Sequence, residues 1–190
     1  MVMKSGINIL VEGDTDKEFL KLYLKYLNIE ILDNQIKITN GKNDIKRVSQ
    51  IIKGEWLIIF DADDDIEVAK ENIKDQLKEL NVSLDNIKIF LFPNNKDSGN
   101  LETILENIAI HKEILTCFDC YECCLSKNMI GDKSFKLPPK KSKVFAYMSS
   151  FGFKNGIKKE EFDFSAYVDF NSVCLSDLKT FLQNALGENK

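Results

Sequence analysis

Five consecutive large apolar residues, Trp56 to Phe60 (WLIIF), are followed by four acidic residues within the next five positions (DADDD). A strand that is apolar on both faces is typical of a parallel sheet covered by helices on each side. Carboxylates crowded at the end of such a strand repel one another unless a positive charge joins them. This stretch therefore predicts a buried strand that ends at a charged site.

Segments with strand-like and helix-like patterns alternate through the first hundred residues. The predicted strands are Ile7–Val11, Gln35–Thr39, Trp56–Phe60 and Ile87–Phe92, and the predicted helices are Asp16–Leu27, Asn43–Ile52 and Ile66–Leu80. Strands and helices in this order imply right-handed crossovers and a mostly parallel sheet.

The pattern changes after Leu101, where a long helix is expected to begin. Further helices are predicted at Lys143–Phe151 and Leu175–Leu186, and no further strand is expected. We therefore predict an α/β core over residues 1–106, a mostly parallel sheet flanked by helices. A helical C-terminal extension over residues 107–190 is expected to pack on this core as part of a single globular unit.

The composition argues against two classes of protein, membrane proteins and general nucleic-acid coat proteins. The chain has 190 residues, 44% of them hydrophobic, which fits one compact domain with an extension. Its apolar runs are far shorter than the roughly 20 residues of a membrane span, so we expect no membrane association and a cytoplasmic location. A net charge of -4 argues against a general nucleic-acid coat, but not against a site that meets phosphate through a metal ion.

The first acidic motif, LVEGDTDKEF, lies at the end of the first predicted strand. Glu12 ends the strand, Gly13 permits a tight turn, and Asp16 falls in the first turn of the following helix. Thr15 and Glu18 have the spacing of a capping box. Ligands of parallel sheets bind beyond the carboxyl ends of the strands, which places this motif at the expected site.

The second motif is the run that follows Phe60. Side chains alternate in an extended chain, so Asp61 and Asp63 are expected to point to the same side and to reach one ion, while Asp64 turns away. Asp65 is positioned to cap the next helix. Asp61 and Asp63 are therefore candidate metal ligands.

The third motif, PNNKDSGNLETIL, follows the fourth predicted strand and offers Ser98 and Glu102 around a flexible Gly99. Carboxylate oxygens are the ligands that Mg²⁺ and Mn²⁺ prefer, and Mg²⁺ leaves coordination positions for substrate phosphates. A single acid at a strand end is more often a helix cap or a solvated residue. Three acidic motifs at one sheet edge favour a metal site for phosphate chemistry.

Glu12-Gly13 after the first strand and Asp61-Ala62-Asp63 after the third resemble the Toprim domain shared by topoisomerases, primases and several nucleases. The resemblance covers roughly the first hundred residues. Asp16 and the Ser98–Glu102 segment are similar to those of OLD-family nucleases. The whole chain, including YVDFNS near its end, also resembles a small Toprim-like family with no assigned activity.

The resemblance implies one or two Mg²⁺ or Mn²⁺ ions. It implies that Glu12, Asp61 and Asp63 hold the first ion with Asp16 nearby, and that Glu102 and Ser98 serve the second. It further implies a transition-state lysine, for which Lys143 is chosen although Lys140 and Lys141 are equally available. Gly13, Ser98 and Gly99 would contact substrate.

The leading functional hypothesis is a Toprim-fold, metal-dependent phosphodiester hydrolase, a nuclease acting on DNA or RNA. The alternative is a non-catalytic Toprim-like module that binds metal, nucleotide or a partner protein, with the helical extension as a possible protein contact. An aspartyl-phosphate signalling fold fits less well, because it requires paired acids after the first strand where Glu12-Gly13 stands.

Three other features have less specific interpretations. The segment CFDCYECC, Cys117 to Cys124, has the density of a zinc site, but its second half is not visible, and reduced, buried thiols on a packed helix are favoured. His111, the single histidine, is interpreted as structural or exposed. The cluster of Lys136, Lys140, Lys141 and Lys143 fits phosphate contacts and a solvated linker equally.

Overall fold

The computed structural model describes residues 6–48, 54–130, 133–139, 141–152 and 166–187. The chain divides into two compact units, one formed by residues 1–104 and 170–190 and the other by residues 105–169. Part of the predicted extension, residues 170–190, thus belongs to the first unit. Among the helices that the structure describes, none has the length and apolar content needed to cross a membrane.

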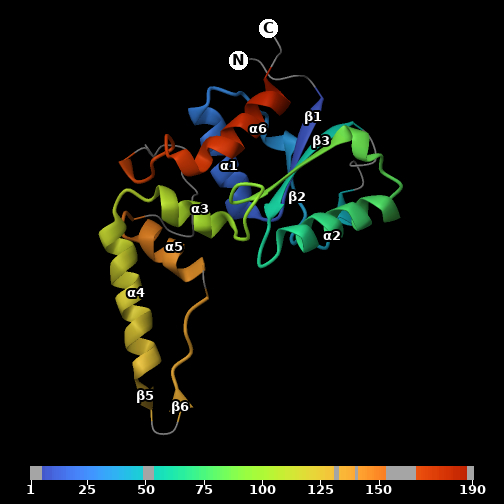
Figure 1. Ribbon diagram of the computed structural model, residues 1–190. Coiled ribbons are helices and arrows are strands. Elements are labelled where there is room, and N and C mark those ends of the chain that lie inside the picture. The colour runs from blue at the N-terminus through green and yellow to red at the C-terminus, as the bar shows by residue number, and fades with distance from the viewer. Residues whose placement is uncertain (1–5, 49–53, 131–132, 140, 153–165, 188–190) are drawn as a thin grey trace. The chain divides into compact units, whose positions relative to one another are not determined.

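The first unit is built on a parallel four-stranded sheet (Figure 1). Its strand order is β2-β1-β3-β4, which agrees with the predicted α/β class and parallel sheet. The bounds are β1 Ile7–Val11, β2 Ile36–Ile38, β3 Glu55–Asp61 and β4 Ile87–Phe92. All four strands therefore direct their carboxyl ends to the same edge.

Helices cover both faces of this sheet. α2 (Ile66–Glu79) lies on one face, and α1 (Asp14–Tyr26) and α6 (Ser176–Leu186) lie on the other (Figure 1). α6 confirms the helix predicted near the C-terminus. The two-sided cover explains why β3 is apolar on both sides.

The alternation of side chains along β3 separates the two halves of the core. Trp56, Ile58 and Phe60 are buried in one cluster with Ile73 and Leu77 of α2. On the opposite face, aromatic rings connect helices to β4: the pairs are Phe19 with Phe92 at 6.1 Å and Phe90 with Phe181 at 5.1 Å between ring centroids. Such aromatic contacts add to the stabilisation from apolar burial.

The prediction of a helix at Asn43–Ile52 is wrong for the residues of that range that the structure describes. Only a short 3-10 helix, Ile45–Arg47, forms there, and residues 49–52 lie outside the described residues. Gln76 of α2 holds this loop: its amide accepts a hydrogen bond from the Ile45 backbone N–H at 3.1 Å and donates one to the Lys42 carbonyl at 2.7 Å. Tertiary hydrogen bonds to α2 therefore support this segment.

The chain after Asn100 forms two helices where one long helix was expected. α3 (Leu101–Ile108) begins in the first unit, and α4 (Lys112–Lys127) follows after a break. The break occurs because the backbone at Ala109 and Ile110 pairs with Tyr167 and Val168; the Ile110 N–H donates to the Tyr167 carbonyl at 3.0 Å.

A short antiparallel hairpin corrects the prediction that no strand follows Leu101. It joins β5 (Met129–Ile130) to β6 (Lys133–Ser134) at the end of α4. α5 (Lys141–Ser149) returns alongside α4, as Figure 1 shows. Strands of two residues leave almost no periodic signal in a sequence, so this element could not be found from apolar alternation.

Candidate functional site: a carboxylate cluster at the sheet edge

The carboxyl ends of β1 and β3 are joined by an acidic side chain. Glu12 follows β1 directly, and its Oε1 accepts a hydrogen bond from the backbone N–H of Asp61 at 2.9 Å. Because that N–H lies at the end of the neighbouring parallel strand, the bond fixes the Glu12 carboxylate beside Asp61. The predicted approach of these two motifs is confirmed.

Asp16 returns toward the start of α1. Its Oδ2 accepts a hydrogen bond from the Gly13 backbone N–H at 3.0 Å. α1 begins at Asp14 with Gly13 as its N-cap, so the carboxylate that caps the helix start belongs to Asp16 and not to the predicted Thr15 and Glu18 pair. Asp16 is thereby held near the strand ends.

Asp61 ends β3 and points at the start of α3. Its Oδ1 accepts a hydrogen bond from the backbone N–H of Leu101 at 2.9 Å. The next residue, Glu102, is only 7% exposed although its side chain ends in a carboxyl group. A helix N-terminus stabilises negative charge, which helps to explain how these acids are tolerated together.

Burial and mutual repulsion act strongly on this cluster. Burial raises the pKa of Asp61 to about 8, and the charges of Asp16, Glu12 and Glu102 contribute to the rise. Burial also raises the pKa of Glu12, with further contributions from Asp16 and Asp63. Four acids from three chain segments therefore share one electrostatic environment in which ionisation of Asp61 is disfavoured.

Asp63 does not continue the strand, so the extended-chain alternation expected for Asp61 and Asp63 does not describe its backbone. Its φ is +54°, and its backbone forms a two-bond bridge with Gly99, both N···O distances being 2.8 Å. Its carboxylate forms an ion pair with Lys42. The two aspartates therefore occupy different environments.

Lys42 is the site residue that the sequence interpretation missed. It lies in the loop after β2, where Gly41 donates a backbone hydrogen bond to the Glu12 carbonyl at 3.2 Å. The hydrogen bond to Asp63 raises the pKa of the Lys42 ammonium, which keeps it positively charged. A lysine in the loop after a predicted parallel strand was a usable signal, because every such loop reaches the same sheet edge.

Ser98 and Gly99 shape the loop between β4 and α3. The Ser98 hydroxyl donates to the Asp64 carbonyl at 2.9 Å, so its observed role is to join two loops. Gly99 has a φ of +145°, and a Cβ there would lie 3.0 Å from Pro93 and 3.1 Å from Thr103. The lack of space for a Cβ and the positive φ therefore both require glycine at residue 99.

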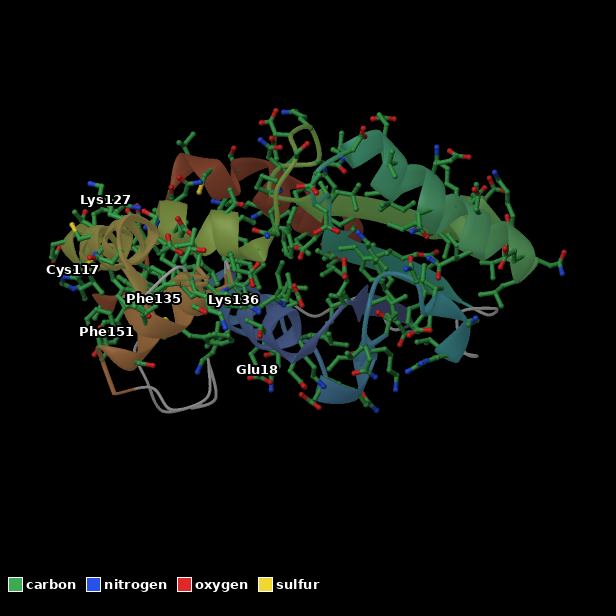
Figure 2. The ribbon with its side chains drawn as sticks, turned by 90° about the horizontal axis from the view of Figure 1, so that it is seen from below. Glu18, Cys117, Lys127, Phe135, Lys136 and Phe151 are labelled. Atoms are coloured by element: carbon green, nitrogen blue, oxygen red, sulfur yellow. The ribbon has the colours of Figure 1, made fainter. Side chains whose placement is uncertain are left out.

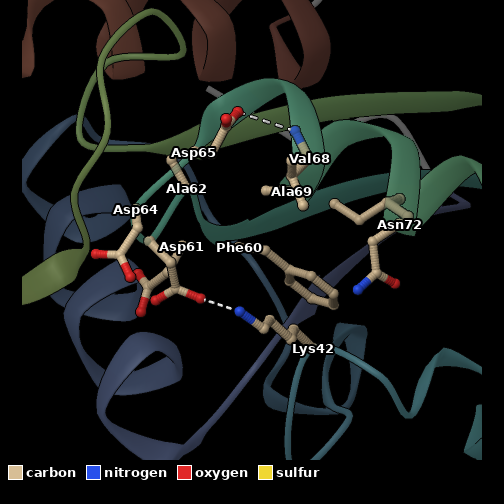
Figure 3. A pocket seen from close by; sticks show the side chains of 11 residues that line it. Lys42, Phe60, Asp61, Ala62, Asp64, Asp65, Val68, Ala69 and Asn72 are labelled. Atoms are coloured by element: carbon tan, nitrogen blue, oxygen red, sulfur yellow. Dashed lines mark hydrogen bonds and ion pairs between the residues drawn. The ribbon is translucent and has the colours of Figure 1, made fainter.

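A pocket of about 220 Å³ adjoins the acids, with Lys42 at its rim (Figure 3). Asp65 lies at its other side and caps α2 as predicted, its Oδ1 accepting from the N–H groups of Glu67 and Val68. The non-acidic side chains that line the pocket are Lys42, Phe60, Ala62, Val68, Ala69, Asn72 and Ile73. The pocket thus combines an acidic side, one ammonium group and an apolar floor.

Lys143 lies in the second unit and is engaged there. Its Nζ lies 2.7 Å from Asp119 and 3.0 Å from Glu106. Burial opposes the charge, but the hydrogen bonds to Asp119 and Glu106 raise the pKa of Lys143 overall. Lys136 and Lys141 are exposed, and Lys140 lies outside the described residues.

The cysteines of the CFDCYECC segment are exposed on α4, so the interpretation as buried thiols is wrong. His111 precedes α4, and its Nδ1 lies 3.1 Å from a carboxylate oxygen of Glu113. The histidine is partly exposed, and its ring also contacts Phe151, so the structure fits both of the expected roles. Neither group belongs to the unit that contains the acidic cluster.

Residues 7–187 match the family described as "Protein of unknown function (DUF3226)". The chain belongs to the DUF3226 family. Searches of curated proteins and of solved structures return no match. The family description assigns no activity, so the resemblance of this DUF3226 protein to Toprim domains and OLD-family nucleases stays a prediction.

The donor chemistry of the DUF3226 site fits the divalent cation that the resemblance implies, but its geometry is not that of a closed metal site. Hard oxygen donors are gathered, and their repulsion is what a divalent cation would relieve. Glu12 and Asp61 each accept a backbone N–H on one oxygen, and a carboxylate has a second oxygen for a further partner. Among the described residues, no three His, Cys, Asp or Glu side chains are arranged around one point as metal ligands.

Proposed function

We propose that the DUF3226 chain is an Mg²⁺- or Mn²⁺-dependent phosphodiester hydrolase that acts on DNA or RNA. The observation that supports this most is the gathering of Glu12, Asp16, Asp61 and Glu102 at the carboxyl edge of a parallel sheet. Ligands of such sheets bind at this edge. The Toprim-like order of Glu12 and the Asp61-Ala62-Asp63 motif adds to the argument.

The chain's own residues have distinct roles in this proposal. Glu12 and Asp61 hold one divalent ion and are themselves positioned by backbone N–H donors. Asp16 supports that ion, and Glu102 serves a second one. When bound, the metal polarises a phosphoryl oxygen and lowers the pKa of a bound water.

Lys42 supplies the positive side of the substrate site. Its ammonium lies against Asp63 at the rim of the pocket, within the same unit as the acids. A phosphate that enters the site displaces part of the Asp63 interaction and gains a cation. Lys143 can take the lysine role implied by the resemblance only by leaving Glu106 and Asp119.

The test is a titration of Mg²⁺ and Mn²⁺ with cleavage of plasmid DNA, single-stranded DNA and RNA. Glu12→Gln is the site variant, because it keeps the volume and removes the charge. Glu30→Gln, an exposed acid after α1, is the matched control. We expect metal-dependent cleavage by the wild type and the control, and at least a hundredfold loss in Glu12→Gln, on the scale of losing a catalytic group.

A non-catalytic module that binds a nucleotide or a partner is the second candidate. The ion pair between Lys42 and Asp63 favours it, because one acid of the Asp61-Ala62-Asp63 motif already has a cation from its own chain. Binding of Mn²⁺ without cleavage of any of the three substrates would support this candidate over the hydrolase.

A further inference from the structure

Four of the five cysteines project from one helix of the second unit, and all four are exposed. They are Cys117, Cys120, Cys123 and Cys124 of α4. Cysteine is among the residue types most often buried, and an exposed free thiol is open to oxidation. A concentration of exposed thiols on one helix therefore calls for a chemical explanation.

The helical repeat places these four thiols together. At about 100° per residue they fall within about 120° of the helix circumference, with Cys120 near the centre. Leu115, which is buried, lies on the opposite side of α4. Figure 2 looks along α4 and shows Cys117 and Lys127 on the side that faces away from α5.

The described residues of one chain offer too few ligands around α4 to close a zinc site. Residues four apart on a helix have Cβ atoms about 5–6 Å apart, so Cys120 and Cys124 can reach one ion. A structural zinc site takes four ligands in a tetrahedron. Among the described residues, no group of three or more suitable side chains surrounds one point. A second copy of this chain would bring an identical pair of thiols to the same ion.

We infer that α4 is a zinc-dependent dimerisation surface, in which Cys120 and Cys124 of two copies of this chain bind one Zn²⁺. Twofold symmetry presents the same patch from each copy, and two pairs of thiolates then complete the tetrahedron. Tyr121, between the two ligands in sequence, is 51% exposed and offers apolar area for the second copy to cover.

One ligand of this pair, Cys124, and the adjacent Cys123 each contact a neighbouring polar side chain. The Asn128 side-chain amide donates a hydrogen bond to the Cys124 sulfur at 3.5 Å, and donors to a ligating atom orient it and tune its basicity. Lys127 is hydrogen-bonded to Cys123 beside them. Two lysines, one from each copy, oppose the double negative charge of a zinc ion with four thiolates.

The experiment uses the full chain, stripped of metal with EDTA, kept under reductant and then titrated with Zn²⁺. We expect one zinc per two chains by elemental analysis and a doubling of molar mass by light scattering. Co²⁺ in place of Zn²⁺ should give the intense thiolate-to-cobalt absorption of a four-sulfur site. Cys120→Ser/Cys124→Ser should remain monomeric and take up no zinc, whereas Cys174→Ser, which removes the thiol of the first unit, should behave as wild type.

Three results would each overturn the inference. They are one zinc per monomeric chain, no zinc uptake by the wild type, and a dimer that persists both in EDTA and in the double variant. The cobalt spectrum of the wild type gives an independent measure, because it reports sulfur ligands even if the double variant fails to fold.

Discussion

Asp61 is the residue on which the proposed site depends most. It ends a buried strand, accepts a hydrogen bond from the Leu101 N–H, and stands among acids that oppose its ionisation. An acid held in this way is protonated at neutral pH until a cation replaces the proton. The same residue therefore links the stability of the fold to the chemistry of the site.

Replacement of Asp61 by Asn tests this link. The pKa of Asp61 is raised to about 8 in the folded protein, whereas an unfolded Asp titrates near 3.9. Between these values the folded state binds one more proton than the unfolded state, so the free energy of unfolding falls as the pH rises. Below and above this window the contribution is constant.

We expect Asp61→Asn to gain stability relative to wild type between pH 5 and pH 8, by on the order of 4 kcal/mol, because one proton's difference changes the free energy of unfolding by about 1.4 kcal/mol per pH unit and the amide does not titrate. Urea unfolding in EDTA at each pH unit measures the difference. Asp64→Asn, at an exposed position, is the control and should follow the wild type. A difference between Asp61→Asn and wild type that stays constant with pH would contradict the account.

At the scale of elements, helix starts position the site. α1 begins after Gly13, α2 after Asp65, and α3 with Leu101 directly before Glu102. Each start follows a strand end or its loop. The sheet and the helices therefore bring together residues that are far apart in sequence.

Asp65→Ala should shorten or fray the start of α2. The Asp65 carboxylate accepts hydrogen bonds from Glu67 and Val68 at 2.9 and 3.1 Å, and loss of such a cap costs about 1 kcal/mol. The expected result is a lower urea midpoint with an unchanged slope. Asp64→Ala removes a neighbouring carboxylate that does not cap the helix, and an equal loss in that variant would refute the capping role.

The elements that could be predicted from the sequence are those with long apolar patterns. β1, β3, β4 and α2 were found because burial on one or both faces fixes their residue types. The loop at Ile45 and the break after Ile108 could not be found, since they depend on pairing with Gln76 and Tyr167, far along the chain.

The site was predictable to a similar extent. Glu12, Asp16, Asp61 and Glu102 were expected at one edge because parallel strands end together. The sequence did not predict the left-handed conformation of Asp63 or its ion pair with Lys42, because both follow from the backbone bridge between Asp63 and Gly99. Backbone pairing between two loops leaves no periodic signal in the sequence.

At the scale of the whole molecule, the two units separate the candidate lysines. Lys42 shares a unit with the acids, whereas Lys143 is paired with Glu106 and Asp119 in the other unit. In the proposed hydrolase we therefore expect Lys42→Ala to lower the cleavage rate at least tenfold at saturating Mn²⁺, as loss of a charged substrate contact does.

Lys143→Ala is the comparison variant, and we expect its cleavage rate to stay within about twofold of wild type, because Lys143 is engaged by Glu106 and Asp119 and not by the acidic cluster. Rates measured with single-stranded substrates under identical conditions decide between the two lysines. A large loss in Lys143→Ala with an unchanged urea midpoint would instead give Lys143 the role that the resemblance implies.

The central claim is that the carboxylate cluster at the sheet edge binds a divalent cation. Its most direct test is a calorimetric titration with Mn²⁺ at pH 7, carried out in two buffers of different ionisation enthalpy. We expect binding by the wild type with release of about one proton, since Asp61 must deprotonate to ligate the metal. Asp61→Asn should bind at least tenfold more weakly and release no proton. Absence of binding by the wild type at millimolar Mn²⁺, or equal affinity in both proteins, would contradict the account.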